Sequence, residues 1–312
     1  MLQGLFNILR NHFSCLDSRT VYCLSQILLG LIKLRTVNLS ELCLVVSLHS
    51  NKQSSNYRRL QRFFSKAKID SSLVSQLLMG MFGGDNVFLC LDRTNWMFGK
   101  ANINILVLAI SYKSIAVPIM WSFLDHKGNS NIEQRTSLIQ RFIALFGKEC
   151  ISALLADREF VGDKWLKWLD IQGIPFVIRV RENMEIGRVR GELTTANHLV
   201  HGLKPGEKMT LLEKRQITRT PRAIKLHVAA CRNKEGELVV VVTNRPPEEV
   251  LDHYKIRWEI ESRHEKWFLK ILNNPCSNLF SLNHFFDFCK GIIRFHNGLF
   301  NFCRVLRIFM IF

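Results

Sequence analysis

The 312-residue sequence has no apolar run long enough to cross a lipid bilayer. Its long uncharged stretches, such as residues 20–32 and 271–286, are interrupted by Gln, Asn, Ser or His, whereas a spanning helix needs about 18 or more apolar residues. Met1 is not followed by a basic region and an apolar block, so no signal peptide is expected. The sequence therefore predicts a protein that does not enter a membrane.

The sequence also lacks the usual signatures of cysteine and phosphate-loop chemistry. Its nine cysteines are scattered without a CxxC pair, and its ten histidines show no metal-ligand spacing. There is no glycine-rich phosphate loop and no internal repeat. A disulfide framework and a zinc site are therefore not expected, and a reducing, cytoplasmic location is the simpler interpretation.

Acidic residues are scarce relative to basic ones. Lys and Arg number 43 against 26 Asp and Glu, which gives a net charge of +17. With 47% apolar residues the chain is not of the disordered class, and its length suits a large domain plus a smaller one. The charge excess favours a polyanionic partner such as nucleic acid.

Residues 1–84 have the apolar spacing of helices, with Asn38 or Ser40 and Asp70 or Ser71 as candidate caps. A short helix over 54–68 carries many cations, with apolar residues on its other side. Two interpretations of this helix stay open: a solvated basic face, or a face laid against DNA phosphates. The second assigns DNA contacts to Arg58, Arg59 and Arg62.

Beyond Gly83-Gly84-Asp85 the pattern changes to that of an α/β protein. Apolar runs at 87–91, 103–110 and 115–121 predict consecutive strands, followed by a helix over 131–146, a strand over 151–156, a helix over 163–172 and a strand over 175–180. This order predicts a mixed sheet flanked by helices within residues 85–182.

Residues 183–245 predict a β-rich insertion, with strands at 209–212, 224–231 and 238–243. Pro246-Pro247 then opens a helix in which Pro247 occupies the first turn. Residues 246–270 are expected to return to the core, and 271–312 form an atypical tail rich in Phe and Asn.

Three acidic residues stand out by position. Asp92 and Asp157 each follow an apolar strand, and Glu261 lies on the helix after the insertion. Carboxylates at the carboxyl edge of a sheet, joined by one from a helix, can hold two divalent metals for phosphoryl transfer. Taken singly, each of these acids also fits an ordinary turn, cap or helix-surface position.

The sequence blocks around these acids resemble a known family. Leu91-Asp92-Arg93-Thr94-Asn95-Trp96, Ala156-Asp157-Arg158-Glu159-Phe160 and Tyr254-x-x-Arg257-Trp258-x-Ile260-Glu261 are similar to the three catalytic blocks of insertion sequence 4 family transposases. The resemblance spans roughly residues 50–261. It implies a DDE transposase with a ribonuclease H-like catalytic core, a β-rich insertion and an N-terminal helical domain.

By this resemblance, Asp92, Asp157 and Glu261 are the catalytic, metal-binding triad. The implied cofactor is Mg²⁺, for which Mn²⁺ can substitute. Tyr254 and Arg257 are the implied contacts to DNA phosphates, and their i, i+3, i+7 spacing with Glu261 places all three on one helix face. Arg93 and Arg158 flank the triad, either to position phosphate or metal or as buried scaffold.

The resemblance further implies the partners and the reaction. These are double-stranded DNA, comprising the terminal inverted repeats and the target DNA, and a second copy of the chain in a homodimer that bridges two ends. Water cuts a DNA strand, and the exposed 3′-hydroxyl then joins to target DNA. A bacterial cytoplasmic location at the nucleoid follows.

The match fails after Glu261. The family's Lys is expected at position 268, where this chain has Phe268. One hypothesis is a frameshift just after Glu261; the alternative is simple divergence with a basic tail. Besides an active transposase, two functions stay open: an impaired DNA-binding remnant or inhibitor of transposition, and a ribonuclease H-like DNA nuclease without strand transfer.

Overall fold

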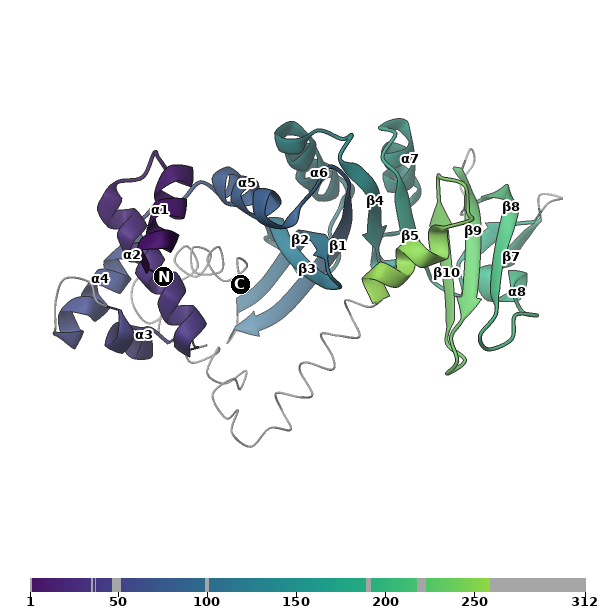
Figure 1. Ribbon diagram of the computed structural model, residues 1–312. Helices are drawn as coiled ribbons and strands as arrows, with labels where there is room; N and C mark the ends of the chain where they lie inside the picture. The colour runs from purple at the N-terminus through teal and green to yellow at the C-terminus, as the bar shows by residue number, and fades with distance from the viewer. Residues whose placement is uncertain are drawn as a thin grey trace. The chain divides into compact units, whose positions relative to one another are not determined.

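The computed structural model describes residues 2–34, 36, 38–46, 52–98, 101–188, 192–217 and 223–258 (Figure 1). The chain divides into two compact units, with the division between Leu78 and Met79. This division falls inside helix α5 (Ser71–Phe82), a few residues before the expected boundary at residue 84. In the described ranges, no helix has the length and apolar character that a membrane span requires.

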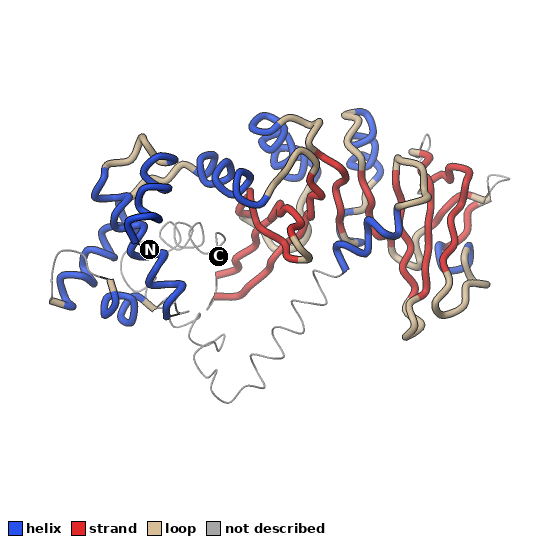
Figure 2. The backbone as a smooth tube through the Cα atoms, in the orientation of Figure 1, coloured by secondary structure: helices blue, strands red, loops and turns tan. Residues whose placement is uncertain are grey.

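The N-terminal unit is helical, as the spacing of its apolar residues predicts (Figure 2). Its helices are α1 (Leu2–His12), α2 (Ser18–Leu34), α3 (Leu39–Val45) and α4 (Gln53–Lys66), followed by the first part of α5. The Asn38 side chain accepts a hydrogen bond from the Ser40 amide and caps α3, and Asp70 accepts one from the Ser72 amide at 2.9 Å. Both expected caps are confirmed.

The second unit is built on an eight-stranded mixed sheet with strand order β3-β2-β1-β4-β5-β10-β9-β8. Strands β1, β4 and β5 run parallel, and the remaining neighbours pair antiparallel. The strands are β1 (Val87–Phe98), β2 (Ala101–Tyr112), β3 (Ile115–Leu124), β4 (Ile151–Ala156), β5 (Phe176–Val180), β8 (Lys208–Gln216), β9 (Lys225–Arg232) and β10 (Leu238–Thr243). All the apolar runs expected to form strands do so.

Helices cover both faces of this sheet. On one face, Val250, Leu251 and Tyr254, from a helix over residues 250–258, pack with Cys90 and Leu155 in a buried cluster. Helix α6 (Ile132–Phe146) contacts β2, β3 and α7 (Asp163–Ile171), and α6 begins with a capping box between Asn131 and Gln134. Both faces of the central strands are thus buried, which explains their uninterrupted apolar runs.

The helix over 250–258 begins later than expected. Residues 247–249 are bends, so Pro247 precedes the helix instead of occupying its first turn. The Pro247 carbonyl instead accepts a hydrogen bond from the Val250 amide. The expectation of a first-turn proline is therefore wrong, and the helix starts three residues after it.

The β-rich insertion extends the same sheet. Strand β10 pairs with β5 along the register Val240↔Val180 to Thr243↔Val177, and β9 and β8 follow outward. A two-stranded sheet of β6 (Glu185–Gly187) and β7 (Leu193–Thr195), with the short helix α8 (Ala196–Leu199), completes the insertion. The insertion is therefore continuous with the core through main-chain hydrogen bonds.

Candidate catalytic site

The two aspartates expected to bind metal each directly follow the last residues that pair two neighbouring strands with each other. Strands β1 and β4 are parallel, with Cys90 opposite Leu155 and Leu91 opposite Ala156. The next positions in this register are Asp92 and Asp157. Asp157 directly follows the last residue of β4 and begins the 3-10 helix η1 (Arg158–Phe160), where its side chain makes no capping hydrogen bond.

Asp92 lies in the middle of a strand and not, as the sequence indicates, at its end. Strand β1 continues to Phe98, because its second half pairs with β2 from Arg93↔Leu106 to Phe98↔Ala101. Only the pairing with β4 stops at Leu91. Asp92 is exposed, and its Oδ1 accepts a hydrogen bond from the Arg93 amide at 2.8 Å.

Strand alternation places both aspartates on the face that the helix over 250–258 covers. Side chains on a strand alternate between faces, so Asp92 shares a face with Cys90, and Asp157 with Leu155. Cys90 and Leu155 belong to the buried cluster that includes Tyr254. The two carboxylates therefore lie on the same sheet face as the residues that pack against this helix, one position further along each row of side chains.

Two further expected site residues come from that helix. Tyr254 is 6% exposed and Arg257 is 4% exposed, whereas Trp258 on another side of the helix is 39% exposed. The helix thus presents Tyr254 and Arg257 toward the protein interior, as the i, i+3 spacing predicts. Glu261, the third acid of the expected triad, lies outside the described residues.

Arg179 is a residue of this site that the sequence reasoning missed. Strand β5 pairs with β4 through Ala156↔Ile178, so the next position in register sets Arg179 beside Asp157. Val177, two residues earlier on the same face, belongs to the buried cluster. The sequence does contain a signal for this role, because Arg179 is a charged residue within an otherwise apolar strand, Phe176-Val177-Ile178-Arg179-Val180.

Charges around Arg179 keep it protonated. Burial alone would lower the pKa of its guanidinium, but the hydrogen bond to Glu237 and the acidic groups of Tyr254, Glu237 and Asp157 raise the pKa overall. Its Nη2 lies 2.8 Å from Glu237 Oε1 and donates to the Leu238 carbonyl at 3.4 Å. Asp92, Asp157 and Arg179 thus each follow the last position of parallel pairing on three neighbouring strands, with the Arg179–Glu237 ion pair at one end.

Arg93 faces the other side of the sheet. Its Nε and Nη2 contact the two carboxylate oxygens of Glu159 at 3.2 and 3.0 Å, and its Nη1 contacts Asn104 Oδ1 at 3.2 Å. The Arg93 side chain is only 13% exposed. Of the two roles expected for Arg93, these contacts favour the buried scaffold over a DNA contact.

Further hydrogen bonds stabilise the region around Arg93 and Glu159. Asn104 is 1% exposed and donates to the His126 and Gly128 carbonyls, each at 2.9 Å. Arg135 of α6 donates to the Glu159 carbonyl, and its guanidinium lies 5.1 Å from the centre of the Phe160 ring. Strand β1, helix α6 and the η1 turn are therefore cross-linked immediately behind the aspartates.

The other expected DNA contacts lie at the surface. Arg158 is exposed in η1, next to Asp157. Arg58 and Arg62 are exposed on α4 of the N-terminal unit, and Arg59 is partly buried there. Leu60, Phe63 and Phe64 of α4 are buried, which confirms the expected apolar seam of this helix.

The aspartate pair suits a divalent cation. Two adjacent carboxylates repel each other unless a cation or a proton lies between them, and carboxylate oxygens are the ligands that Mg²⁺ prefers. The part of the chain that the structure describes holds no group of three acidic, His or Cys side chains that could bind a metal. Glu261, the third acid of the expected triad, lies outside that part.

Comparison with known proteins identifies a family whose matched segment includes most of these residues. The family described as "Transposase DDE domain" matches residues 127–282, half of the chain. This segment includes Asp157, Arg179, Tyr254, Arg257 and Glu261, whereas Asp92 precedes it. No curated protein matches the chain.

Among solved structures, the chain is similar to one titled "Cryo-EM structure of piggyBac transposase synaptic complex with hairpin DNA". The two are 12% identical with a TM-score of 0.42, over 95% of this chain and 72% of the other. The expected fold is confirmed: a ribonuclease H-like mixed sheet with a β-rich insertion and N-terminal helices.

Proposed function

This chain belongs to the transposase DDE domain family, and from that premise we propose that it cuts DNA at the terminal inverted repeats of an insertion sequence and joins the 3′ ends to target DNA. The three sequence blocks further assign it to the insertion sequence 4 group of this family. The observation that supports the proposal is the parallel register of β1 and β4, which ends one residue before Asp92 and Asp157, on the face where Tyr254 packs.

Asp92 and Asp157 would hold Mg²⁺ or Mn²⁺, with Glu261 as the third carboxylate. Divalent ions held there stabilise the negative charge that develops on the attacking and leaving oxygens of phosphoryl transfer. The sequence spacing of Tyr254, Arg257 and Glu261 supports this assignment, because positions i, i+3 and i+7 share one face of a helix, and the first two of these residues are buried.

The cations beside the aspartates position the DNA strand. Arg179 keeps a permanent positive charge next to Asp157, and Arg257 is a second guanidinium on the covering helix. Guanidinium groups bind phosphate oxygens through two parallel N–H donors, which fixes the orientation of the phosphate. Tyr254 would add a hydrogen bond to a neighbouring phosphate.

Both chemical steps are displacements at phosphorus. In the first, water attacks a phosphodiester at the end of the element and the 3′ oxygen leaves as a hydroxyl. In the second, that hydroxyl attacks a phosphodiester of the target, and the target's own 3′ oxygen leaves. Each step forms one P–O bond and breaks one, so no covalent protein intermediate is needed.

The proposal is tested with a DNA duplex that carries the inverted repeats found beside the gene. Cleavage and strand joining are followed on gels with Mg²⁺, and Asp92→Asn or Asp157→Asn should lower the cleavage rate by about 10²–10³-fold. Asp85→Asn is the matched control, because Asp85 is an exposed aspartate just before β1. Equal cleavage by Asp92→Asn and the parent chain would overturn the triad.

Two other outcomes distinguish the alternative functions. Nicks without joined products would identify a ribonuclease H-like nuclease. Binding without any cleavage would identify a remnant or inhibitor, which the Phe268 departure from the family's Lys motivates. The reading frame past Glu261 in the surrounding DNA tests the frameshift hypothesis directly, since another frame should then encode a continuation with Lys at position 268.

A further inference from the structure

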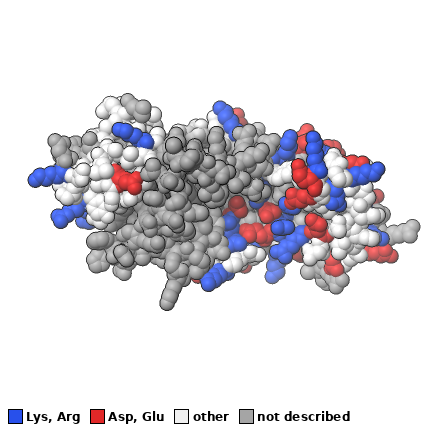
Figure 3. Space-filling view, turned by 90° about the horizontal axis from the view of Figure 1, so that it is seen from below, with Lys and Arg blue, Asp and Glu red and all other residues white. Residues whose placement is uncertain are grey.

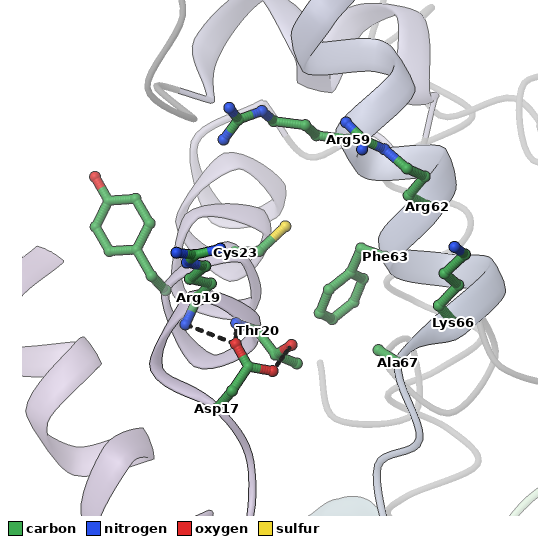
Figure 4. Close-up of a pocket in the computed structure, with 10 residues that line it drawn as sticks. Asp17, Arg19, Thr20, Cys23, Arg59, Arg62, Phe63, Lys66 and Ala67 are labelled. Atoms are coloured by element: carbon green, nitrogen blue, oxygen red, sulfur yellow. Dashed lines mark hydrogen bonds between the residues drawn. The ribbon is translucent and has the colours of Figure 1, made fainter.

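The N-terminal unit contains a groove between α2 and α4 that the catalytic chemistry does not use. It has a volume of about 740 Å³ and is open to solvent along one side. Arg59, Arg62 and Lys66 line it from α4, and Arg19 lines it from α2 (Figure 4). The ring of Phe63 points into the space between the two helices. The groove thus has cations on both walls and an apolar group at its floor.

The cations on α4 are spaced to follow a sugar–phosphate backbone. Positions 59, 62 and 66 are related by i, i+3 and i+7, so they lie along one face of the helix. At 1.5 Å rise per residue they extend over about 10.5 Å, whereas successive phosphates of one DNA strand are about 3.4 Å apart along the helix axis. The row therefore covers about three phosphates, with Arg19 on the opposite wall.

Little negative charge opposes these cations. Among the described residues that line the groove, Asp17 is the one acid; its carboxylate accepts hydrogen bonds from the Thr20 hydroxyl and from the Arg19 and Thr20 amides and stays ionised, against four cations. Burial keeps the Cys23 thiol on the floor neutral. Within the described ranges, none of Arg19, Arg59, Arg62 and Lys66 forms an ion pair with a carboxylate, so their charges are available to a ligand.

The charge of residues 1–78 agrees with this. The first 78 residues hold ten Lys or Arg and three acids, so 10 − 3 = +7, whereas residues 79–264 hold 27 and 21, so 27 − 21 = +6. The N-terminal unit therefore has the higher charge density. In the view of Figure 3, its described surface shows basic side chains with little acid, whereas basic and acidic side chains are interspersed on the second unit.

We propose that the α2–α4 groove holds the sugar–phosphate backbone of a DNA strand, with Arg19, Arg59, Arg62 and Lys66 on its phosphates. This rests on the proposed function for the choice of DNA as the polyanion. It differs from the sequence expectation, because it adds Arg19 and Lys66 and excludes Arg58, which does not line the groove. Backbone contacts carry no sequence information, so the groove supplies affinity and not the choice of DNA end.

The test is the salt dependence of DNA binding by the full chain. Binding of a labelled 30-base-pair duplex is measured by fluorescence anisotropy in EDTA, so that no cleavage occurs. Each lost phosphate contact should lower the slope of log K against log salt by about 0.9, which weakens binding about five-fold at 0.15 M salt. Arg19→Ala should show one such loss, and Arg59→Ala/Arg62→Ala two.

Two control variants make the test specific. Lys33→Ala removes an exposed cation from α2 outside the groove and should leave the slope within error, whereas Arg59→Lys/Arg62→Lys keeps the charge and should bind within about two-fold of the parent. Equal losses for Lys33→Ala and Arg19→Ala would overturn the proposal, as would an unchanged slope in the double alanine variant. Lys66→Gln, at an exposed position, repeats the test should the double variant fail to fold.

Failure of the groove and failure of the proposed function are separable. If the parent chain binds with the expected slope but never cleaves in Mg²⁺, the transposase proposal fails and the groove stands. If Asp92→Asn loses cleavage while Arg59→Ala/Arg62→Ala binds like the parent, the groove fails and the catalytic proposal stands.

Discussion

Arg93 and Glu159 form a two-point ion pair that joins the residue after Asp92 to the turn after Asp157. The Nε–Oε1 and Nη2–Oε2 distances are 3.2 and 3.0 Å. The side chains are 13% and 24% exposed. Because the pair joins β1 to η1 next to the aspartates, it links the two backbone segments that carry them.

We predict that Glu159→Gln destabilises the second unit. Its loss leaves the Arg93 guanidinium partly buried beside a neutral amide, which should lower the free energy of unfolding by about 1–3 kcal/mol. Urea unfolding followed by tryptophan fluorescence measures this difference. Arg158→Gln, one residue away at an exposed position, should change the same quantity by less than about 0.5 kcal/mol. A similar loss in both variants would show that the pair is not responsible.

Arg179 provides a prediction about catalysis. We expect Arg179→Gln to lower the single-turnover cleavage rate about ten-fold or more, because the charge beside Asp157 that orients the phosphate is lost. Arg179→Lys should recover only part of the rate, since a lysine lacks the planar fork.

The matched control for Arg179 is Lys234→Gln. Lys234 is exposed in the turn that precedes Glu237, so this variant removes one positive charge outside the set of Asp92, Asp157 and Arg179. It should cleave at the parent rate. If both variants slow cleavage equally, Arg179 acts only through the overall charge of the unit.

Cys23 should resist alkylation. Burial raises the pKa of its thiol to about 12, although the charge of Arg59 works in the opposite direction. At pH 8 a thiol reagent should therefore modify the exposed Cys15 and leave Cys23 intact, as read by peptide mass spectrometry. Rapid modification of Cys23 in the folded chain would contradict its burial.

The same thiol predicts a pH dependence of stability. Because the pKa is higher in the folded than in the unfolded chain, the contribution is fully present below pH 9 and declines as the pH rises toward 12. The free energy of unfolding should therefore fall less steeply between pH 9 and 10.5 in Cys23→Ala than in the parent chain. Parallel pH profiles would exclude this contribution.

The turn between β2 and β3 supplies a stabilising change. Lys113 and Ser114 have φ angles of 49° and 63°, in the left-handed region that disfavours side chains. Ser114→Gly should therefore raise the free energy of unfolding by about 0.5 kcal/mol. Ser111→Gly, within β2, should instead lower it by about 0.5–1 kcal/mol. The opposite order in thermal melting would refute the strain.

Much of the fold was predictable because its signals are local. Apolar runs mark strands buried on both faces, and Asn131 with Gln134 marks the start of α6. The positions of Asp92 and Asp157, each one residue past the paired Leu91 and Ala156, also follow from local rules, since each comes after an apolar run. These features follow from residues that are close together in the sequence and do not depend on which strands become neighbours.

Other features depend on long-range pairing and were not predictable. Arg93, Thr94 and Asn95 do not look like strand residues, yet β1 continues through them because β2 pairs with each. Arg179 joins the site only because β5 lies next to β4. Neither neighbour can be identified from the residues themselves, so the sequence predicts that β1 ends at Leu91 and gives Arg179 no place in the site.

The junction of β5 with β10 makes the insertion an arm of the sheet and not a hinged flap. Four register pairs join β10 to β5, and Glu237, the residue just before β10, holds the Arg179 guanidinium. To swing as a separate body, the insertion would have to break this ladder and release that guanidinium. Any movement of the insertion would therefore also move the Arg179 guanidinium, which lies near Asp157.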